Sequence, residues 1–145
     1  MEKSFKLEEI KKVAQNLIVQ VDKKRTKNSM IIALSGELGT GKTTLTQEIA
    51  KLLGVKEKLV SPTFVIMKKY KTKDKKYKNL IHIDAYRLNN SQELLNLGWP
   101  EIIKDKDNLI IIEWPERIPE CFNNNVCKVF LNHQDKQTRT IEILL

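Results

Sequence analysis

The chain has 145 residues, of which 41% are hydrophobic and 30% are charged, a balance typical of a soluble globular protein rather than a disordered one. This length suits one ordinary core, so we expect residues 1–145 to form a single domain. The longest apolar runs, such as 30–34 and 109–112, are too short to span a bilayer, and the N-terminal sequence lacks an apolar signal-peptide core. We therefore expect a cytoplasmic protein without a membrane partner, in which Cys121 and Cys127 are reduced.

The positive charge of the chain is carried mostly by lysine. There are 26 basic and 18 acidic residues, for a net charge of +8, and only Arg25, Arg87, Arg117 and Arg139 are arginines. Arginine is favoured for planar, bidentate binding of bases and phosphates, so we interpret the excess mainly as surface composition that permits an RNA-containing assembly. The densest run, 68–78, is interpreted as a solvated hairpin tip, with contact to RNA phosphates as the alternative.

Hydrophobic periodicity predicts an amphipathic helix over about residues 7–21, followed by a polar connection. The continuous apolar run 30–35 is typical of a strand buried on both faces. A glycine-rich loop follows, and apolar residues at helical spacing then predict a second helix. Gly54 suits the left-handed position just past the end of that helix.

The second half of the chain is predicted to contain mostly strands. Asn90 and Glu93 resemble a capping box that opens a short helix, which Gly98 ends. This order predicts one α/β domain with a mixed, mostly parallel sheet flanked by helices. The strands are expected at residues 63–70, 79–84, 108–113, 126–131 and 138–145, the last two as a C-terminal antiparallel hairpin.

The glycine-rich loop, GELGTGKT at 36–43, fits the pattern G-x-x-x-x-G-K-[ST] between a strand and a helix. Glycines let successive backbone N–H groups converge on an anion, and the helix adds the positive end of its dipole. Lys42 would neutralise the β- and γ-phosphates of a nucleotide, and Thr43 would place a hydroxyl on Mg²⁺. The candidate nucleotide-binding residues of the loop are Glu37, Leu38, Gly39, Thr40, Gly41, Lys42, Thr43 and Thr44.

Two acids follow apolar strands, Asp84 after 80–83 and Glu113 after 109–112. Ligands bind at such strand ends in open α/β sheets, so either acid could ligate Mg²⁺ or orient an attacking water, and the spacing leaves both assignments open. His82 shares a strand face with Asp84 and is interpreted first as a core histidine.

Other candidates are less specific. The segment SPTF at 61–64 offers the hydroxyl of Thr63 to a γ-phosphate-sensing switch, with a simple strand entry as the alternative. Trp114 could stack on adenine or on a partner, with plain packing as the alternative.

Absent motifs narrow the nucleotide and the reaction. The sequence has no N-K-x-D motif, and Asp84 is followed by Ala-Tyr-Arg rather than by the spacing D-x-x-G of GTPases, so ATP is favoured. No arginine-rich lid is evident, which favours an ATPase over a small-molecule kinase. Two alternatives remain, a nucleotide-gated binding module that docks on partners in its ATP-bound state and a small P-loop kinase.

The motifs GELGTGKTT, SPTF, HIDAYRL, LLNLG and IEWPER occur in one order that resembles the TsaE (YjeE) family. The resemblance covers residues 36–118 well, whereas the N-terminal helix and the closing hairpin fit only by position. It implies a P-loop NTPase-like fold that binds ATP and Mg²⁺. It further implies Thr43 and Glu113 as metal ligands, Asp84 close to the γ-phosphate and Thr63 as a switch-like threonine. Trp114 matches a functional aromatic residue, and Arg139 matches a basic residue before the last strand.

The resemblance also implies a cellular role. Proteins of this family are ATPases that act with TsaD and TsaB to install the threonylcarbamoyl group on adenosine 37 of tRNAs reading codons that begin with A. The ATPase does not itself transfer the group, and its contact with tRNA would be indirect. We therefore expect partner-dependent hydrolysis of ATP, with Lys42, Thr63, Asp84 and Glu113 as the catalytic set.

Overall fold

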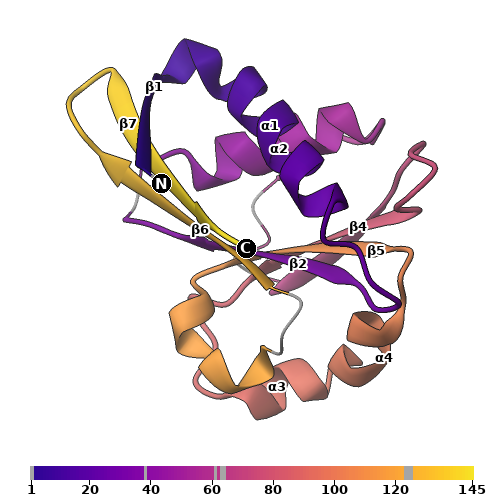
Figure 1. The fold of residues 1–145 in the computed structure, drawn as a ribbon. Coiled ribbons are helices and arrows are strands. Elements are labelled where there is room, and N and C mark those ends of the chain that lie inside the picture. Colours follow the sequence, from indigo (N-terminus) through magenta and orange to yellow (C-terminus); the bar gives the residue numbers. More distant parts are fainter. Residues whose placement is uncertain (1, 38, 61, 63–64, 123–125) are drawn as a thin grey trace.

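A seven-stranded mixed sheet organises the fold in this computed structural model, which describes residues 2–37, 39–60, 62, 65–122 and 126–145. Figure 1 shows the sheet between two helical layers, with α1 and α2 on one face and α3 and α4 on the other. The helices are α1 (Ile10–Asp22), α2 (Lys42–Leu52), α3 (Ser91–Leu95) and α4 (Trp99–Lys104). The strands are β1 (Glu2–Lys6), β2 (Met30–Ser35), β3 (Met67–Lys71), β4 (Asn79–Asp84), β5 (Asn108–Glu113), β6 (Val126–His133) and β7 (Thr138–Leu144).

The strand order is β1-β7-β6-β2-β5-β4-β3. The central strands β6, β2, β5 and β4 are parallel, β3 pairs antiparallel with β4, and β7 pairs antiparallel with β6 and β1. The predicted α/β fold is therefore confirmed, including its mixed sheet, its flanking helices and its C-terminal hairpin. The topology also brings the carboxyl ends of β2, β4 and β5 to one edge of the sheet.

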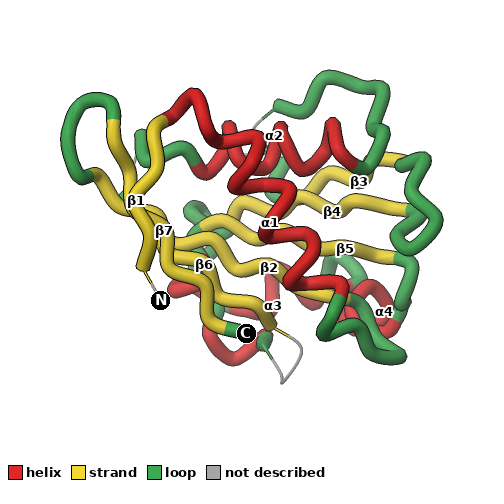
Figure 2. The backbone as a smooth tube through the Cα atoms, turned by 45° about the horizontal axis from the view of Figure 1, so that its top comes forward, coloured by secondary structure: helices red, strands yellow, loops and turns green. Residues whose placement is uncertain are grey.

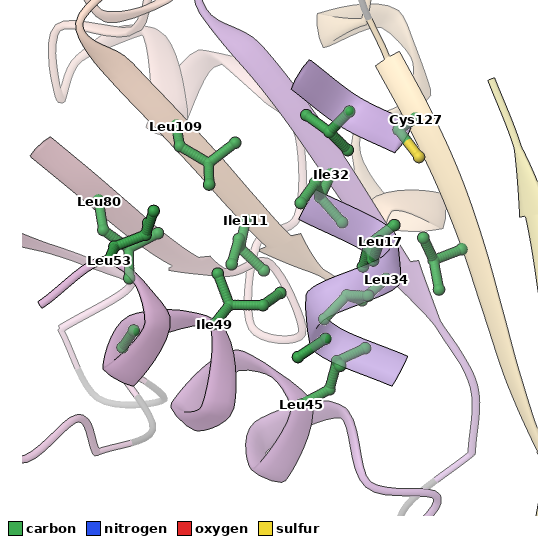
Figure 3. Close-up of a cluster of buried hydrophobic side chains, with 14 of the residues drawn as sticks. Leu17, Ile32, Leu34, Leu45, Ile49, Leu53, Leu80, Leu109, Ile111 and Cys127 are labelled. Atoms are coloured by element: carbon green, nitrogen blue, oxygen red, sulfur yellow. The ribbon is translucent and has the colours of Figure 1, made fainter. Parts of the chain in front are cut away.

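The sheet buries apolar side chains on both faces, which explains why its central strands are continuous apolar runs. On β5, Leu109 and Ile111 belong to the core under α1 and α2, whereas Ile110 and Ile112 belong to the core on the other face. Figure 3 shows the first of these cores, where Leu45, Ile49 and Leu53 lie over the strands together with Leu17 of α1.

The N-terminus differs from the prediction, because residues 2–6 form a strand that the sequence pattern does not indicate. Only Phe5 of this strand is buried, so its sequence has no continuous apolar run. Its hydrogen bonds come from pairing with β7, more than 130 residues away in the chain. The predicted helix accordingly begins later, at Ile10, after a 3-10 turn at Leu7–Glu9 in which the Lys6 N–H donates to Glu9 Oε1 at 2.9 Å.

The strand predicted at 63–70 begins only at Met67. The N–H groups of Val65 and Ile66 both donate to Pro62 O, and Ile66 has a left-handed φ of 70°, so the chain turns here instead of extending. Residues 63 and 64 lie outside the described residues. The lysine-rich run after this turn forms β3 and the β3–β4 hairpin turn, as predicted.

The region after β4 contains more helix than predicted. The Asn90 side chain accepts from Gln92 N and caps α3 as expected, and Gly98 is left-handed, but α4 starts directly after this glycine. The stretch after β5 forms 3-10 turns η2 (Pro115–Arg117) and η3 (Pro119–Cys121), where no regular element was expected. None of the helices in the described part of the chain is long and apolar enough to cross a membrane.

The two cysteines test the burial pattern directly. Burial raises the pKa of the Cys127 thiol to about 11, and only 1% of this residue is exposed, whereas Cys121 is half-buried in η3. The thiolate is the reactive form, so at pH 8 only about one Cys127 in a thousand is ionised. We expect an aromatic disulfide reagent to modify Cys121 first and Cys127 only on unfolding. If the remaining cysteine were modified at the same rate in the Cys121→Ser and Cys127→Ser variants, the result would contradict the fold.

Candidate nucleotide-binding site

The glycine-rich loop lies between the end of β2 and the start of α2, at the edge where the parallel strands end. The two predicted acids lie at the same edge. Asp84 is the register partner of Glu113, and Glu113 is also paired with Leu34, two residues before Gly36. The fold therefore brings the loop and both acids together, as the sequence predicted.

Three glycines set the path of the loop. Gly39 and Gly41 have left-handed φ values of 78° and 104°, which suit residues without a side chain. At Gly36 a Cβ atom would lie 2.4 Å from the Leu131 carbonyl oxygen of β6 and 2.8 Å from Thr40 Oγ1. Both contacts are too short for any side chain, so the close packing of the loop on β6 requires glycine at this position.

Lys42 is the cation at the centre of the loop, and only 6% of it is exposed. Its Nζ donates to the carbonyl oxygens of Gly36 and Glu37, the latter at 3.0 Å, and lies 4.8 Å from the centre of the Trp114 ring. Burial lowers the pKa of this ammonium group, while the negative charges of Glu113, Glu116 and Asp84 oppose that shift. The loop thus folds around a partly desolvated positive charge.

Glu113 joins the loop to the core of the sheet. Its Oε1 lies 3.5 Å from Thr43 Oγ1, and its Oε2 lies 2.7 Å from His82 Nε2. His82 is fully buried and Glu113 is only 4% exposed, so this contact is shielded from water. A carboxylate can only accept, so the Nε2–H tautomer of His82 donates to Glu113.

Thr43 and Glu113 form an oxygen pair that suits Mg²⁺. Two oxygens bound to one Mg²⁺ at about 2.1 Å cannot lie more than about 4.2 Å apart, and this pair satisfies that limit. Within the described ranges no group of three or more His, Cys, Asp or Glu side chains could hold a metal alone.

Asp84 is tied to the segment that precedes β3. Its backbone N–H donates to Ile66 O at 2.9 Å, and its Oδ1 accepts from the Tyr86 N–H at 3.0 Å. Two predicted site residues, Leu38 and Thr63, lie outside the described residues, and their roles stay predictions.

Trp114 follows Glu113 in a left-handed conformation, with a φ of 59°. This turn directs the ring toward Lys42 and toward Tyr86, whose ring centre lies 5.1 Å away. The ring therefore lies beside the loop, where packing and ligand contact are both available to it.

Arg139 reaches the loop from β7. Its Nη2 donates to Gly39 O at 3.4 Å, and its Nη1 donates to carbonyl oxygens of the β6–β7 turn, including Asp135 O at 2.9 Å. Its Nε is buried and has no hydrogen-bond partner among the residues that the structure describes. The guanidinium group therefore links the C-terminal hairpin to the glycine-rich loop.

The remaining loop residues differ in exposure. Thr40 is buried and its hydroxyl donates to Glu37 O at 2.8 Å, so this side chain closes the loop on itself. Glu37 and Thr44 are exposed. A cavity of about 420 Å³ lies nearby, and its lining residue Leu7 would lie 3.9 Å from a Cβ atom at Gly41. The cavity is lined by Lys6, Leu7, Glu8, Lys136 and Gln137.

Sequence reasoning missed two features of the site. The interpretation of His82 as a core histidine is confirmed, because it is fully buried, but its contact with Glu113 was not predicted. The signal was present, because His82 and Glu113 are polar residues near the ends of two apolar strands. The cavity had no such signal, because its residues come from both ends of the chain.

Comparison with known proteins gives a consistent result. The family model described as "Threonylcarbamoyl adenosine biosynthesis protein TsaE" matches residues 5–141. A tRNA threonylcarbamoyladenosine biosynthesis protein TsaE of Rickettsia felis is 35% identical over 138 residues, which cover 94% of this chain and 75% of that protein. A TsaE protein of Nostoc sp. is 39% identical over 117 residues, covering 78% and 68% of the two chains.

A solved structure agrees with the fold. The crystal structure of Bacillus subtilus YdiB superposes with a TM-score of 0.67 at 27% sequence identity, covering 97% of this chain and 84% of that one. The family model matches from within β1 to within β7. The N-terminal helix and the closing hairpin, which fitted only by position in the sequence, are therefore included in the family match. The chain belongs to the TsaE family of threonylcarbamoyl adenosine biosynthesis proteins.

Proposed function

We propose that this chain is a Mg²⁺-dependent ATP-binding and ATP-hydrolysing subunit that acts with TsaD and TsaB type proteins in the cytoplasm. In this role it supports threonylcarbamoylation of adenosine 37 in tRNAs that read codons beginning with A. The observation that carries the proposal is the meeting of Lys42, the Thr43–Glu113 oxygen pair and Asp84 at one edge of the sheet. The relatives' role in tRNA threonylcarbamoyladenosine biosynthesis supports the choice of pathway.

The loop residues bind the triphosphate of the substrate. Backbone N–H groups from Gly39 to Thr44 and the N-terminal end of α2 attract the phosphate oxygens. The Lys42 ammonium group neutralises charge on the β- and γ-phosphates, and its partial burial strengthens that interaction because little water competes for it. Bound Mg²⁺ supplies further charge neutralisation on the phosphates.

The two acids have different surroundings, which supports different roles. Glu113 lies against Thr43 on one side and His82 on the other, as a fixed metal ligand would. Asp84 is joined to the segment before β3 because its backbone N–H donates to Ile66 O, and we assign its carboxylate to orienting the attacking water near the γ-phosphate. Thr63 precedes Ile66 in the chain and is the proposed γ-phosphate sensor.

The cavity beside Gly41 is the proposed site of the adenine base. It adjoins the phosphate loop, and Leu7 offers an apolar contact for a flat ring. Arg139 supports the same region, because its guanidinium group bonds to Gly39 O and to the turn that carries Lys136. Trp114 lies with its ring centre 4.8 Å from Lys42 Nζ and is proposed to contact the ligand or a partner there.

Loss of the Lys42 or Glu113 side chain should strongly reduce the rate of ATP hydrolysis. With TsaD and TsaB present, we expect Lys42→Ala and Glu113→Ala each to lower the rate of ATP hydrolysis on the order of 10²-fold or more, because phosphoryl transfer depends on charge stabilisation. The matched control is Lys51→Ala, which removes an exposed lysine from the same helix. The measurement is the rate of phosphate release for all three variants. Wild-type rates in both Lys42→Ala and Glu113→Ala would refute the assignment of these residues to the site of ATP hydrolysis.

His82 is proposed to position Glu113 and not to touch the substrate. The 2.7 Å contact fixes one carboxylate oxygen and leaves the other facing Thr43. Groups that orient a metal ligand typically contribute 10- to 100-fold to metal affinity. His82→Leu keeps an apolar side chain but removes the donor, whereas His82→Gln places an amide donor near the position of Nε2.

The test compares nucleotide affinity with and without Mg²⁺ by calorimetry. For His82→Leu we expect the gain in affinity that Mg²⁺ gives to fall by about 10-fold or more, with little change when Mg²⁺ is chelated. His82→Gln should recover part of the gain. Equal weakening with and without Mg²⁺ would mean that His82 is only structural. If the wild-type chain binds no nucleotide, the proposed function itself fails.

A further inference from the structure

Three loops meet at the end of the sheet opposite the phosphate loop. They precede the starts of β2, β4 and β5, which are adjacent because Met30 pairs with Leu109 and Asn79 pairs with Asn108. Figure 2 shows the connections after α1, between β3 and β4, and after α4 at this one end of the molecule. We call residues 22–27, 71–78 and 104–107 together the basic end.

The basic end carries most of the net charge of the protein. Its three loops contain eleven lysines and arginines and four aspartates, a net charge of +7 out of the +8 of the whole chain. The other 127 residues, with fifteen basic and fourteen acidic side chains, are almost neutral. The lysine excess is therefore concentrated at one end of the molecule, which the interpretation of the charge as surface composition did not specify.

Direct contacts hold the loops of the basic end together. Asp22 of α1 accepts from Tyr77 Oη at 2.9 Å and from Lys76 Nζ at 2.8 Å in the hairpin turn. The Arg25 guanidinium group donates to Lys76 O and lies 4.9 Å from the centre of the buried Tyr77 ring. Lys78 forms an ion pair of 3.8 Å with Asp107 in the third loop. These contacts hold the three loops that carry the lysines in fixed positions relative to one another.

The ten lysines of the basic end are all exposed. Of these ten, only Lys76 and Lys78 form ion pairs with described residues. Protein interfaces usually contain aromatic or aliphatic anchors at their centre. No large hydrophobic side chain of the basic end is exposed, and Tyr77, its one aromatic residue, is 1% exposed. Exposed ammonium groups without apolar anchors suit a phosphate backbone better than a protein surface.

Resting on the proposed role in tRNA modification, we propose that the basic end binds the phosphate backbone of tRNA directly, in contrast to the indirect contact that the family resemblance implies. Lysines act here as point charges, so the contact neutralises phosphates without reading the base sequence. Strands of six residues separate this surface from the phosphate loop by roughly 20 Å at about 3.3 Å per residue. ATP and tRNA therefore occupy opposite ends of the protein and do not compete for one site.

The test replaces by glutamine four exposed lysines of the basic end that form no ion pair with a described residue: Lys24→Gln, Lys27→Gln, Lys73→Gln and Lys75→Gln. The matched control makes the same charge change at exposed lysines elsewhere, with Lys3→Gln, Lys11→Gln, Lys12→Gln and Lys128→Gln. Affinity for a fluorescent tRNA transcript is measured by anisotropy over a range of KCl concentrations.

We expect the basic-end variant to bind tRNA at least tenfold more weakly, with a shallower dependence of log K on log salt, because each lost phosphate contact removes about 0.7 to 0.9 from that slope. The control should remain within about threefold of wild type. Equal losses in both variants would mean that only net charge matters and would overturn the proposal.

Two further outcomes are decisive. If the basic-end variant keeps its tRNA affinity but loses binding to the purified TsaD and TsaB proteins, the surface serves an acidic protein instead. ATP binding should persist in the basic-end variant, because its substitutions lie far from the phosphate loop. This readout separates failure of the tRNA surface from failure of the proposed ATP site.

Discussion

The buried ammonium group of Lys42 organises the functional edge of this protein. It bonds to the carbonyl oxygens of Gly36 and Glu37, so the loop curls around it. Burial makes the charge costly, and the nearby acids Glu113, Glu116 and Asp84 offset part of that cost. A loop that encloses a cation at the N-terminal end of α2 is suited to a polyanionic ligand, and Thr43, Glu113 and Trp114 lie around this position.

The parallel strands supply the acids because their carboxyl ends must meet. Asp84 and Glu113 are register partners on β4 and β5, and β2 delivers the loop beside them. The same geometry gathers the opposite ends of the strands, where the loops before β2, β4 and β5 carry most of the net charge. The parallel arrangement of β2, β5 and β4 thus gives the protein two chemically distinct ends. One end suits the phosphates of a nucleotide, and the other suits the phosphate backbone of a nucleic acid.

Local patterns predicted the parts of the fold that are locally determined. The structure agrees with the prediction for the apolar strands 30–35, 79–84 and 108–113 and for the loop between β2 and α2. Burial on both faces and the spacing of glycines are properties of consecutive residues, so a local pattern is enough to predict them. β1 was missed because its stability comes from pairing with β7. His82 contacts Glu113 and Arg139 contacts Gly39, each on a distant element. The polar ends of β4 and β5 indicate the first contact, whereas no spacing within one segment reveals the second.

The most direct test of the account follows the backbone amides during a titration of the labelled protein with ATP and Mg²⁺ by nuclear magnetic resonance. The account predicts that the largest shifts fall on the N–H groups of residues 39–44, with further shifts around Leu7 and Gln137, and that amides of the 71–78 hairpin turn stay unchanged. Loop amides that do not respond at saturating ATP, or shifts confined to another surface, would contradict the claim that this loop binds the triphosphate.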